Sequence, residues 1–173
     1  KSTPTEWKRH NELVKSSILG KYIDPNDISP GKLSSQQFLS TLSVLAENEA
    51  NIKRLIEDQK ANSHGFYYVR LNINGVWRYV SVDNKLPYAN GEALGAQSFP
   101  DHESELWPAL IEKAYAKVYS GYDVFNRATP RENFLRDLTG APVRKYLITD
   151  NDLPNVIRNA LAASQPVLAV PKH

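Results

Sequence analysis

The sequence predicts an α+β fold, in which helices pack around one central helix and beside a small antiparallel β-sheet. Apolar residues recur at helical spacing in 34–45 and again in 105–119. Between these two segments, alternating runs are joined by Asn74-Gly75, the dipeptide most typical of a tight β-hairpin. The 173 residues are 41% hydrophobic, which suffices for one core and predicts a single domain over 1–173.

Charge and composition exclude several classes of function. The net charge is only +2, and 21 Lys and Arg are scattered among 19 Asp and Glu, so no nucleic-acid partner is expected. The chain has no cysteine, which excludes disulfides, thiolate zinc sites and a cysteine nucleophile. No apolar run approaches the roughly 18 residues of a spanning helix, so we expect no membrane insertion and a cytoplasmic location. The sequence lacks an initiator Met and ends just after an apolar run, so it reads as part of a larger protein.

The first 29 residues are predicted to form a helix followed by a loop. The helix covers 5–17, with Trp7 and Leu13 among its apolar positions. The loop at 20–31 is rich in turn residues and contains Asp24-Pro25-Asn26-Asp27. Acidic loops of this kind either cap helices or hold a hard cation.

Two central helices are predicted within 34–58. The first begins near Ser34 or Ser35 and buries an apolar face that includes Phe38; a shorter one follows at 51–58. The first turn of a helix suits a thiolate because its backbone N–H groups and dipole favour negative charge. Gln36 and Gln37 stand there instead, and a carboxamide cannot act as such a nucleophile.

The remaining chain alternates between strands and helices. The hairpin at 65–83 pairs the runs 66–73 and 76–83, and 85–100 is expected to be a loop. The further elements are helices at 105–119, 130–138 and 153–163 and short strands at 144–148 and 167–170. Thr129 is the expected cap of the 130–138 helix, Gly140 its end, and Asp150 or Asn151 the expected cap of the last helix.

Several motifs, in the right order, resemble the calpain protease core, specifically the first, cysteine-bearing subdomain of this papain-like fold. They are WKR (7–9), GKL (31–33) with FLS (38–40), VSVDNKLP (80–87) with GEAL (91–94), ELWPALIEKAYAK (105–117) and LTG (138–140). The resemblance covers nearly the whole chain, and it implies the fold of that subdomain.

The departures from the family pattern fall on its chemistry. Gln36 matches the nucleophilic cysteine, Gln37 the tryptophan beside it, and Pro30 the glutamine of the oxyanion hole. Proline offers neither a side-chain donor nor a backbone N–H. The family's histidine and asparagine belong to a second subdomain outside this sequence. The four histidines here, at 10, 64, 102 and 173, show no pairing and are expected on the surface or in loops.

A calcium site is the second feature that the resemblance implies. Asp27 and Glu105 match the two carboxylates that hold Ca²⁺ in this subdomain, where loop carbonyls complete the ligand set. The loop Leu19-Gly20-Lys21-Tyr22 is about one residue out of register with the family. The alternative is structural: Asp27 caps its loop, and Glu105 lies favourably in the first turn of its helix.

Two further groups of residues have a functional and a structural interpretation. The aromatic residues Tyr67, Tyr68, Trp77, Tyr79 and Trp107 would suit a peptide-binding surface, but we expect most of them in the core. Ser34-Ser35 would replace the missing nucleophile only with a His/Asp arrangement that the sequence lacks, and helix capping explains them better.

These observations predict a catalytically inactive calpain-like domain that serves as a protein-interaction or scaffold module. Degenerate calpain-like proteins of flagellated protists imply a cytoskeletal or flagellar setting, although no partner can be identified. One alternative is a calcium-dependent endopeptidase that needs a missing second subdomain or chain. The other is a calcium-responsive regulator without catalysis.

Overall fold

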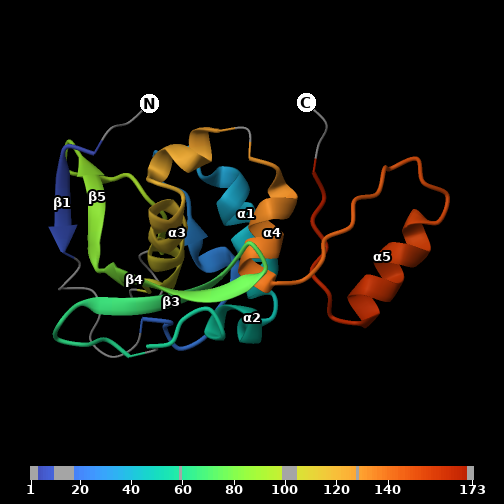
Figure 1. Ribbon diagram of the computed structural model, residues 1–173, viewed down its shortest axis with the longest axis horizontal. Coiled ribbons are helices and arrows are strands. Elements are labelled where there is room, and N and C mark those ends of the chain that lie inside the picture. The colour runs from blue at the N-terminus through green and yellow to red at the C-terminus, as the bar shows by residue number, and fades with distance from the viewer. Residues whose placement is uncertain (1–3, 10–17, 59, 99–104, 128, 171–173) are drawn as a thin grey trace.

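The computed structural model describes residues 4–9, 18–58, 60–98, 105–127 and 129–170. In chain order its elements are β1 (Glu6–Arg9), the 3₁₀ turn η1 (Pro25–Asp27), β2 (Ile28–Ser29), α1 (Gln36–Ala46), α2 (Glu49–Lys53), β3 (Phe66–Ile73), β4 (Val76–Asp83), β5 (Lys85–Ala89), β6 (Glu92–Ala93), β7 (Gln97–Ser98), α3 (Trp107–Val118), the 3₁₀ turn η2 (Tyr122–Asn126), α4 (Arg131–Thr139) and α5 (Leu153–Ala162). Figure 1 shows α1, α3 and α4 packed above the β3–β4 hairpin, with β1 and β5 at one side. The predicted α+β class is confirmed.

Helix α1 lies at the centre of the core, as predicted. Its residues Phe38, Leu42 and Leu45 are fully buried. The Phe38 ring contacts the rings of Tyr115 and Phe134, with centroids 4.8 and 5.4 Å apart. Aromatic pairs at this spacing add to the free energy gained by burying their area, so α1 is held mainly by its tertiary contacts.

The β3–β4 hairpin is also confirmed. Its register pairs Tyr67 with Val82 and Ile73 with Val76, and the turn residues Asn74 and Gly75 have φ values of 53° and 82°, as a type I′ turn requires. The chain from 55 to 57 then pairs with the other edge of β3. The predicted 51–58 helix is therefore wrong over its second half: α2 ends at Lys53, and residues 54–55 form a turn before the bridge at Ile56.

The expected N-terminal helix and the expected 85–100 loop are wrong for a shared reason. Residues 6–9 form β1, which pairs antiparallel with β5 from Glu6 opposite Tyr88 to Arg9 opposite Lys85. This pairing satisfies the backbone groups of both segments, and it overrides the weak local preference of each. Residues 10–17 of the expected helix lie outside the described residues. The segment after β5 adds the short strands β6 and β7.

Helices α3 and α4 match their predictions closely. Trp107 and Leu110 of α3 are fully buried, and Gly140 ends α4 in the left-handed conformation with φ 68°. The cap of α4 is Pro130 rather than Thr129. Inside the body, Tyr115 and Tyr119 donate hydrogen bonds to Asp137 Oδ2 at 3.0 and 2.6 Å.

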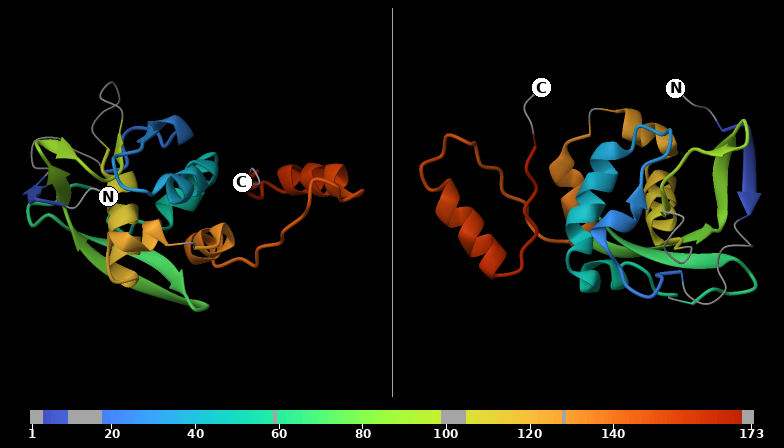
Figure 2. Two further views of the ribbon diagram at one scale, coloured as in Figure 1. Left: turned by 90° about the horizontal axis from the view of Figure 1, so that it is seen from above. Right: turned by 180° about the vertical axis from the view of Figure 1, so that it is seen from behind.

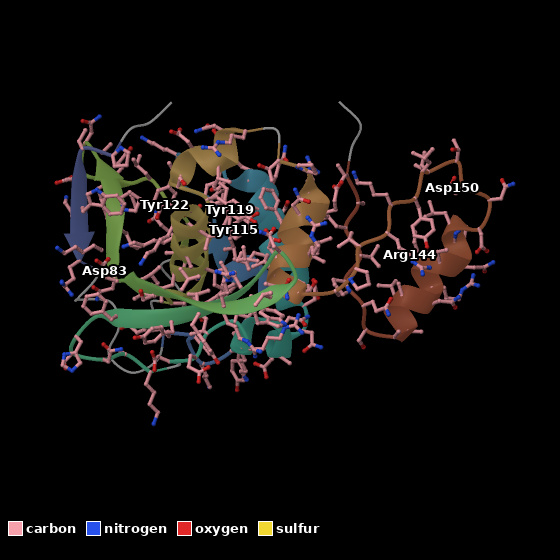
Figure 3. All side chains as sticks on the ribbon, viewed as in Figure 1. Asp83, Tyr115, Tyr119, Tyr122, Arg144 and Asp150 are labelled. Atoms are coloured by element: carbon pink, nitrogen blue, oxygen red, sulfur yellow. The ribbon has the colours of Figure 1, made fainter. Side chains whose placement is uncertain are left out.

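The C-terminal arm, residues 141–170, contrasts with this body because none of its residues is buried. Helix α5 is confirmed, with Asp152 as its cap rather than Asp150 or Asn151, and it stands apart from the body in every view (Figure 2). Figure 3 shows Arg144 and Asp150 on this arm and Tyr115 within the body. The predicted strands at 144–148 and 167–170 are wrong, because neither has a ladder partner among the described residues.

No helix within the described ranges combines the length and the apolar character needed to span a bilayer.

Candidate functional site

The segment that leads into α1 is clamped to the 94–98 loop. Strand β2 pairs with β7, Ile28 opposite Ser98, and Leu33 N–H donates to Leu94 O at 3.0 Å. A Cβ on Gly31 would lie 2.1 Å from the same carbonyl oxygen, so only glycine fits there. This clamp fixes the position of the first turn of α1.

The three positions that the resemblance matches to catalytic residues lie at this end of α1. Gln36 and Gln37 are exposed in the first helical turn, and Pro30 is exposed in the segment before it. The carbonyl of Gln37 accepts hydrogen bonds from the hydroxyls of Ser40 and Thr41 at 3.0 and 2.9 Å. A carboxamide has no readily ionisable proton and is a very poor nucleophile, so neither glutamine could attack a peptide carbonyl from this position.

A buried carboxyl group, Glu112, lies behind this helix end and was not predicted. Its Oε2 accepts a hydrogen bond from Ala96 N–H at 2.9 Å, and a Cβ on Gly95 would lie 2.6 Å from the same oxygen. Burial raises the pKa of Glu112 to about 7, although the nearby Ser35 hydroxyl and Ala96 N–H favour the charged form. The sequence signal was an acidic residue inside a helix whose other positions are mostly apolar.

Ser35 occupies the cap position of α1 but does not cap it with its side chain. It is 1% exposed, and its hydroxyl makes no capping hydrogen bond. Neither Ser35 Oγ nor Glu112 Oε1 has a well-formed hydrogen bond among the described residues. The predicted capping role of Ser35 is therefore wrong in its mechanism, and Ser34 is exposed.

The structure brings Asp27 and Glu105 together, as the resemblance implied. Asp27 ends η1 and accepts a hydrogen bond from Asp24 N–H at 2.7 Å, closing a capping box with Asp24. Glu105 immediately precedes the cap of α3, and its Oε2 accepts a hydrogen bond from the Trp107 indole at 2.7 Å. Both carboxyl groups are buried, at 2% and 7% exposure.

The electrostatics of this pair are those of two carboxylates that compete for one proton or cation. Burial raises the pKa of Glu105 to about 7; the Trp107 indole opposes the shift, whereas Asp27 and Asp24 add to it through their negative charge. Asp27 also raises this pKa through a side-chain hydrogen bond. The two carboxyl groups therefore lie within hydrogen-bonding reach of each other.

The backbone of Gly20 completes the wall of this site. A Cβ at Gly20 would lie 1.8 Å from Glu105 Oε1, and its φ is +71°, so glycine is required both sterically and conformationally. Carboxylate and carbonyl oxygens are the donors that Ca²⁺ prefers. No group of three or more His, Cys, Asp or Glu side chains converges in the described part of the chain, so backbone or water oxygens would have to complete a calcium site.

The other residues that the sequence singled out are divided between core and surface. Tyr67 and Trp107 are buried, as expected, and Trp77 is half-buried with the Arg70 guanidinium 4.8 Å from its ring centroid. Tyr68 and Tyr79 are 48% and 58% exposed, so the core prediction is wrong for these two. His64 is exposed, as expected, whereas the histidines at 10, 102 and 173 lie outside the described residues.

Comparison with known proteins agrees with this geometry. The family model described as "Calpain family cysteine protease" matches residues 1–169. Calpain-C of Drosophila melanogaster is 32% identical over 174 residues, covering 92% of this chain and 25% of that protein. The mouse calpain-2 catalytic subunit is 32% identical, covering 84% and 21%, and human calpain-7 is 34% identical, covering 71% and 16%. The chain thus spans about a quarter of these relatives or less.

Proposed function

This chain belongs to the calpain family of cysteine proteases, and we propose that it is a non-catalytic member that acts by binding other proteins. One observation carries the proposal: the chain contains no cysteine, and Gln36 is the residue that the resemblance matches to the nucleophile. A carboxamide provides neither the thiolate nor the acyl-enzyme intermediate on which cysteine proteases depend.

The retained architecture supports a binding role rather than general decay. The apolar face of α1 is buried, and Leu33 N–H donates a hydrogen bond to Leu94 O. A chain that had lost all function would not need to keep this helix end so well ordered. Pro30 adds to the argument, since the resemblance matches it to the oxyanion-hole glutamine and proline has no donor to offer there.

An activity assay separates this proposal from its enzymatic alternative, in which a second subdomain or chain restores hydrolysis. We expect no calcium-dependent cleavage of unfolded casein above the level of Gln36→Ala, and no labelling by a calpain-type epoxide electrophile. The variant Gln36→Cys is the matched control, because a thiol at a helix N-terminus has a lowered pKa and should react with the electrophile. Turnover by the wild-type chain that Gln36→Ala abolishes would overturn the proposal.

A calcium-responsive regulator is the second candidate, and the convergence of Asp27 and Glu105 favours it. Two buried carboxylates beside the Gly20 backbone provide the oxygen donors that Ca²⁺ prefers. Isothermal titration of the wild type with CaCl₂ should give a saturable heat that Asp27→Ala removes. The absence of any heat with the wild type would reject this site.

The setting implied by the resemblance is cytoskeletal, and it forms part of the proposal. Co-sedimentation of the purified chain with polymerised tubulin, compared with sedimentation of the chain alone, tests it directly. Equal amounts in both pellets would remove tubulin polymers from the set of partners.

A further inference from the structure

Strand β4 has one paired edge and one free edge. Arg70 N–H donates to Leu55 O, and Tyr68 O accepts from Glu57 N–H, so the even-numbered residues of β3 bond to the 55–57 segment. Backbone groups alternate in direction along a strand, which leaves the odd-numbered residues of β3 to bond to β4. The register pairs these with Val76, Arg78, Val80 and Val82 of β4. The backbone groups of Trp77, Tyr79, Ser81 and Asp83 therefore point away from β3.

Two lysines of α3 cover one half of this free edge. Lys113 Nζ donates to Asp83 O at 3.1 Å, and Lys117 Nζ donates to Ser81 O at 2.7 Å. Helix α3 ends at Val118, so its lysines reach no further along β4. The edge groups of Trp77 and Tyr79 have no hydrogen-bond partner in the part of the chain that the structure describes. Exposed strand edges of this kind are templates for pairing with another chain.

A groove of about 510 Å³ lies between β4 and the end of α3, and Tyr79 and Ser81 are the edge residues of β4 that line it. Val80 and Val118 line it with apolar side chains, and Arg78 and Lys117 add two exposed positive charges. No carboxylate lines it. An occupant that complements the groove therefore carries negative charge beside an apolar side chain.

We propose that the free edge of β4 around Tyr79 binds an extended acidic segment of a partner protein by adding it to the hairpin as a further strand. The hydrogen bonds come from the backbone of Trp77 and Tyr79, and the preference for acidic residues comes from Arg78 and Lys117. This inference rests on the proposed function, since it names the chemistry of the partner that the non-catalytic domain binds.

The test is a titration of the full chain, labelled with ¹⁵N, with an end-capped Val-Glu-Val-Glu-Val peptide followed by NMR. We expect saturable shifts of the Trp77, Tyr79 and Ser81 amides, slowed hydrogen exchange at Tyr79, and at least about tenfold weaker binding of the Val-Lys-Val-Lys-Val peptide. Equal affinity for the two peptides, or shifts confined to other elements, would overturn the proposal.

Matched variants separate the backbone from the charge. Tyr79→Pro removes an edge N–H that faces away from the ladder, a position where proline is tolerated, and it should weaken binding about tenfold or more. Tyr79→Ala keeps the N–H and should retain most of the affinity. Lys117→Glu should also lose binding of the acidic peptide, whereas Lys60→Glu, at an exposed lysine that does not line the groove, should not. If Tyr79→Pro binds like wild type, strand addition is wrong.

The remaining outcomes are also decisive. Self-association of the chain through this edge, detected by sedimentation velocity and removed by Tyr79→Pro, would replace the partner peptide with a second copy and so overturn the proposal. Failure of peptide binding leaves the activity assay with Gln36→Ala unaffected. The docking surface and the loss of catalysis can therefore fail separately.

Discussion

The carboxylate pair and the first turn of α1 both contain residues that the family resemblance matches to functional positions, but their side chains lie in very different environments. Asp27 and Glu105 are buried, and each is held by a hydrogen bond, from Asp24 N–H and from the Trp107 indole. Gln36 and Gln37 are exposed. Replacing an exposed side chain at the start of α1 costs the fold little, whereas changing the pair would disturb Trp107 in the core. Substitutions at the exposed positions should therefore be tolerated more easily than substitutions of the buried pair.

Gly20→Ala should have the largest effect on stability of any single substitution that tests this contrast. The new Cβ would meet Glu105 Oε1, which is 1.8 Å from its ideal position, and the buried Glu105 side chain is held by Trp107. We expect a loss of about 3 kcal/mol in the free energy of unfolding, from the clash and the left-handed backbone together. Urea unfolding followed by circular dichroism measures it.

Gly75→Ala is the matched control for this prediction. Gly75 also has a positive φ, of 82°, but nothing lies within 4 Å of its added Cβ. It should therefore lose only the conformational part, about 1 kcal/mol. Equal losses in the two variants would show that Glu105 is free to move, and that the pair is not tied to the core.

The pH dependence of stability should report on both Glu105 and Glu112, and single substitutions should separate their contributions. Both carboxyl groups have a pKa raised by burial to about 7, so the folded state binds more protons than the unfolded state between about pH 4.5 and 7. The free energy of unfolding should therefore fall as pH rises through this window, by about 3 kcal/mol for the fully buried Glu112 and by less for Glu105, whose charge is partly screened. Glu105→Gln and Glu112→Gln should each remove one part of this fall.

Calcium sharpens this comparison. A cation bound between Asp27 and Glu105 favours the charged form of Glu105, so saturating CaCl₂ should abolish its part of the fall and leave that of Glu112 unchanged. Thermal unfolding of the two variants at pH 5 and pH 8, with and without calcium, measures both. A calcium response that survives in Glu105→Gln would contradict the assignment of the site.

Local signals were sufficient where they agreed with the tertiary structure. Asn74-Gly75 marks the hairpin turn, and Gly140 ends α4 in a left-handed conformation that only a few residue types adopt readily. Strand β1 could not be predicted, because its partner lies about 80 residues away, with Glu6 opposite Tyr88. Pro87 made β5 look like a loop, although the β6 ladder pairs only with Tyr88 and Ala89, so the missing N–H of Pro87 breaks no pair in it.

The site was predictable only in part, for similar reasons. Asp27 and Glu105 were found through the resemblance, since nothing in the spacing of two residues so far apart reveals that they meet. Glu112 was missed because its burial depends on the 95–96 loop, whose Ala96 N–H donates to it. Tyr79 was assigned to the core because a strand pattern does not show which face of a hairpin the helices cover.

Gln36→Ala should have the smallest effect, and it completes the comparison. The side chain of Gln36 is exposed in the first turn of α1 and makes no hydrogen bond that the structure records among the described residues. The free energy of unfolding should therefore change by less than about 0.5 kcal/mol, as should that of Gln36→Cys. A loss above about 1 kcal/mol in the same urea titration would mean that glutamine stabilises this helix end. The nucleophile position would then have gained a structural role in place of its chemistry, and the contrast with the buried carboxylate pair would no longer hold.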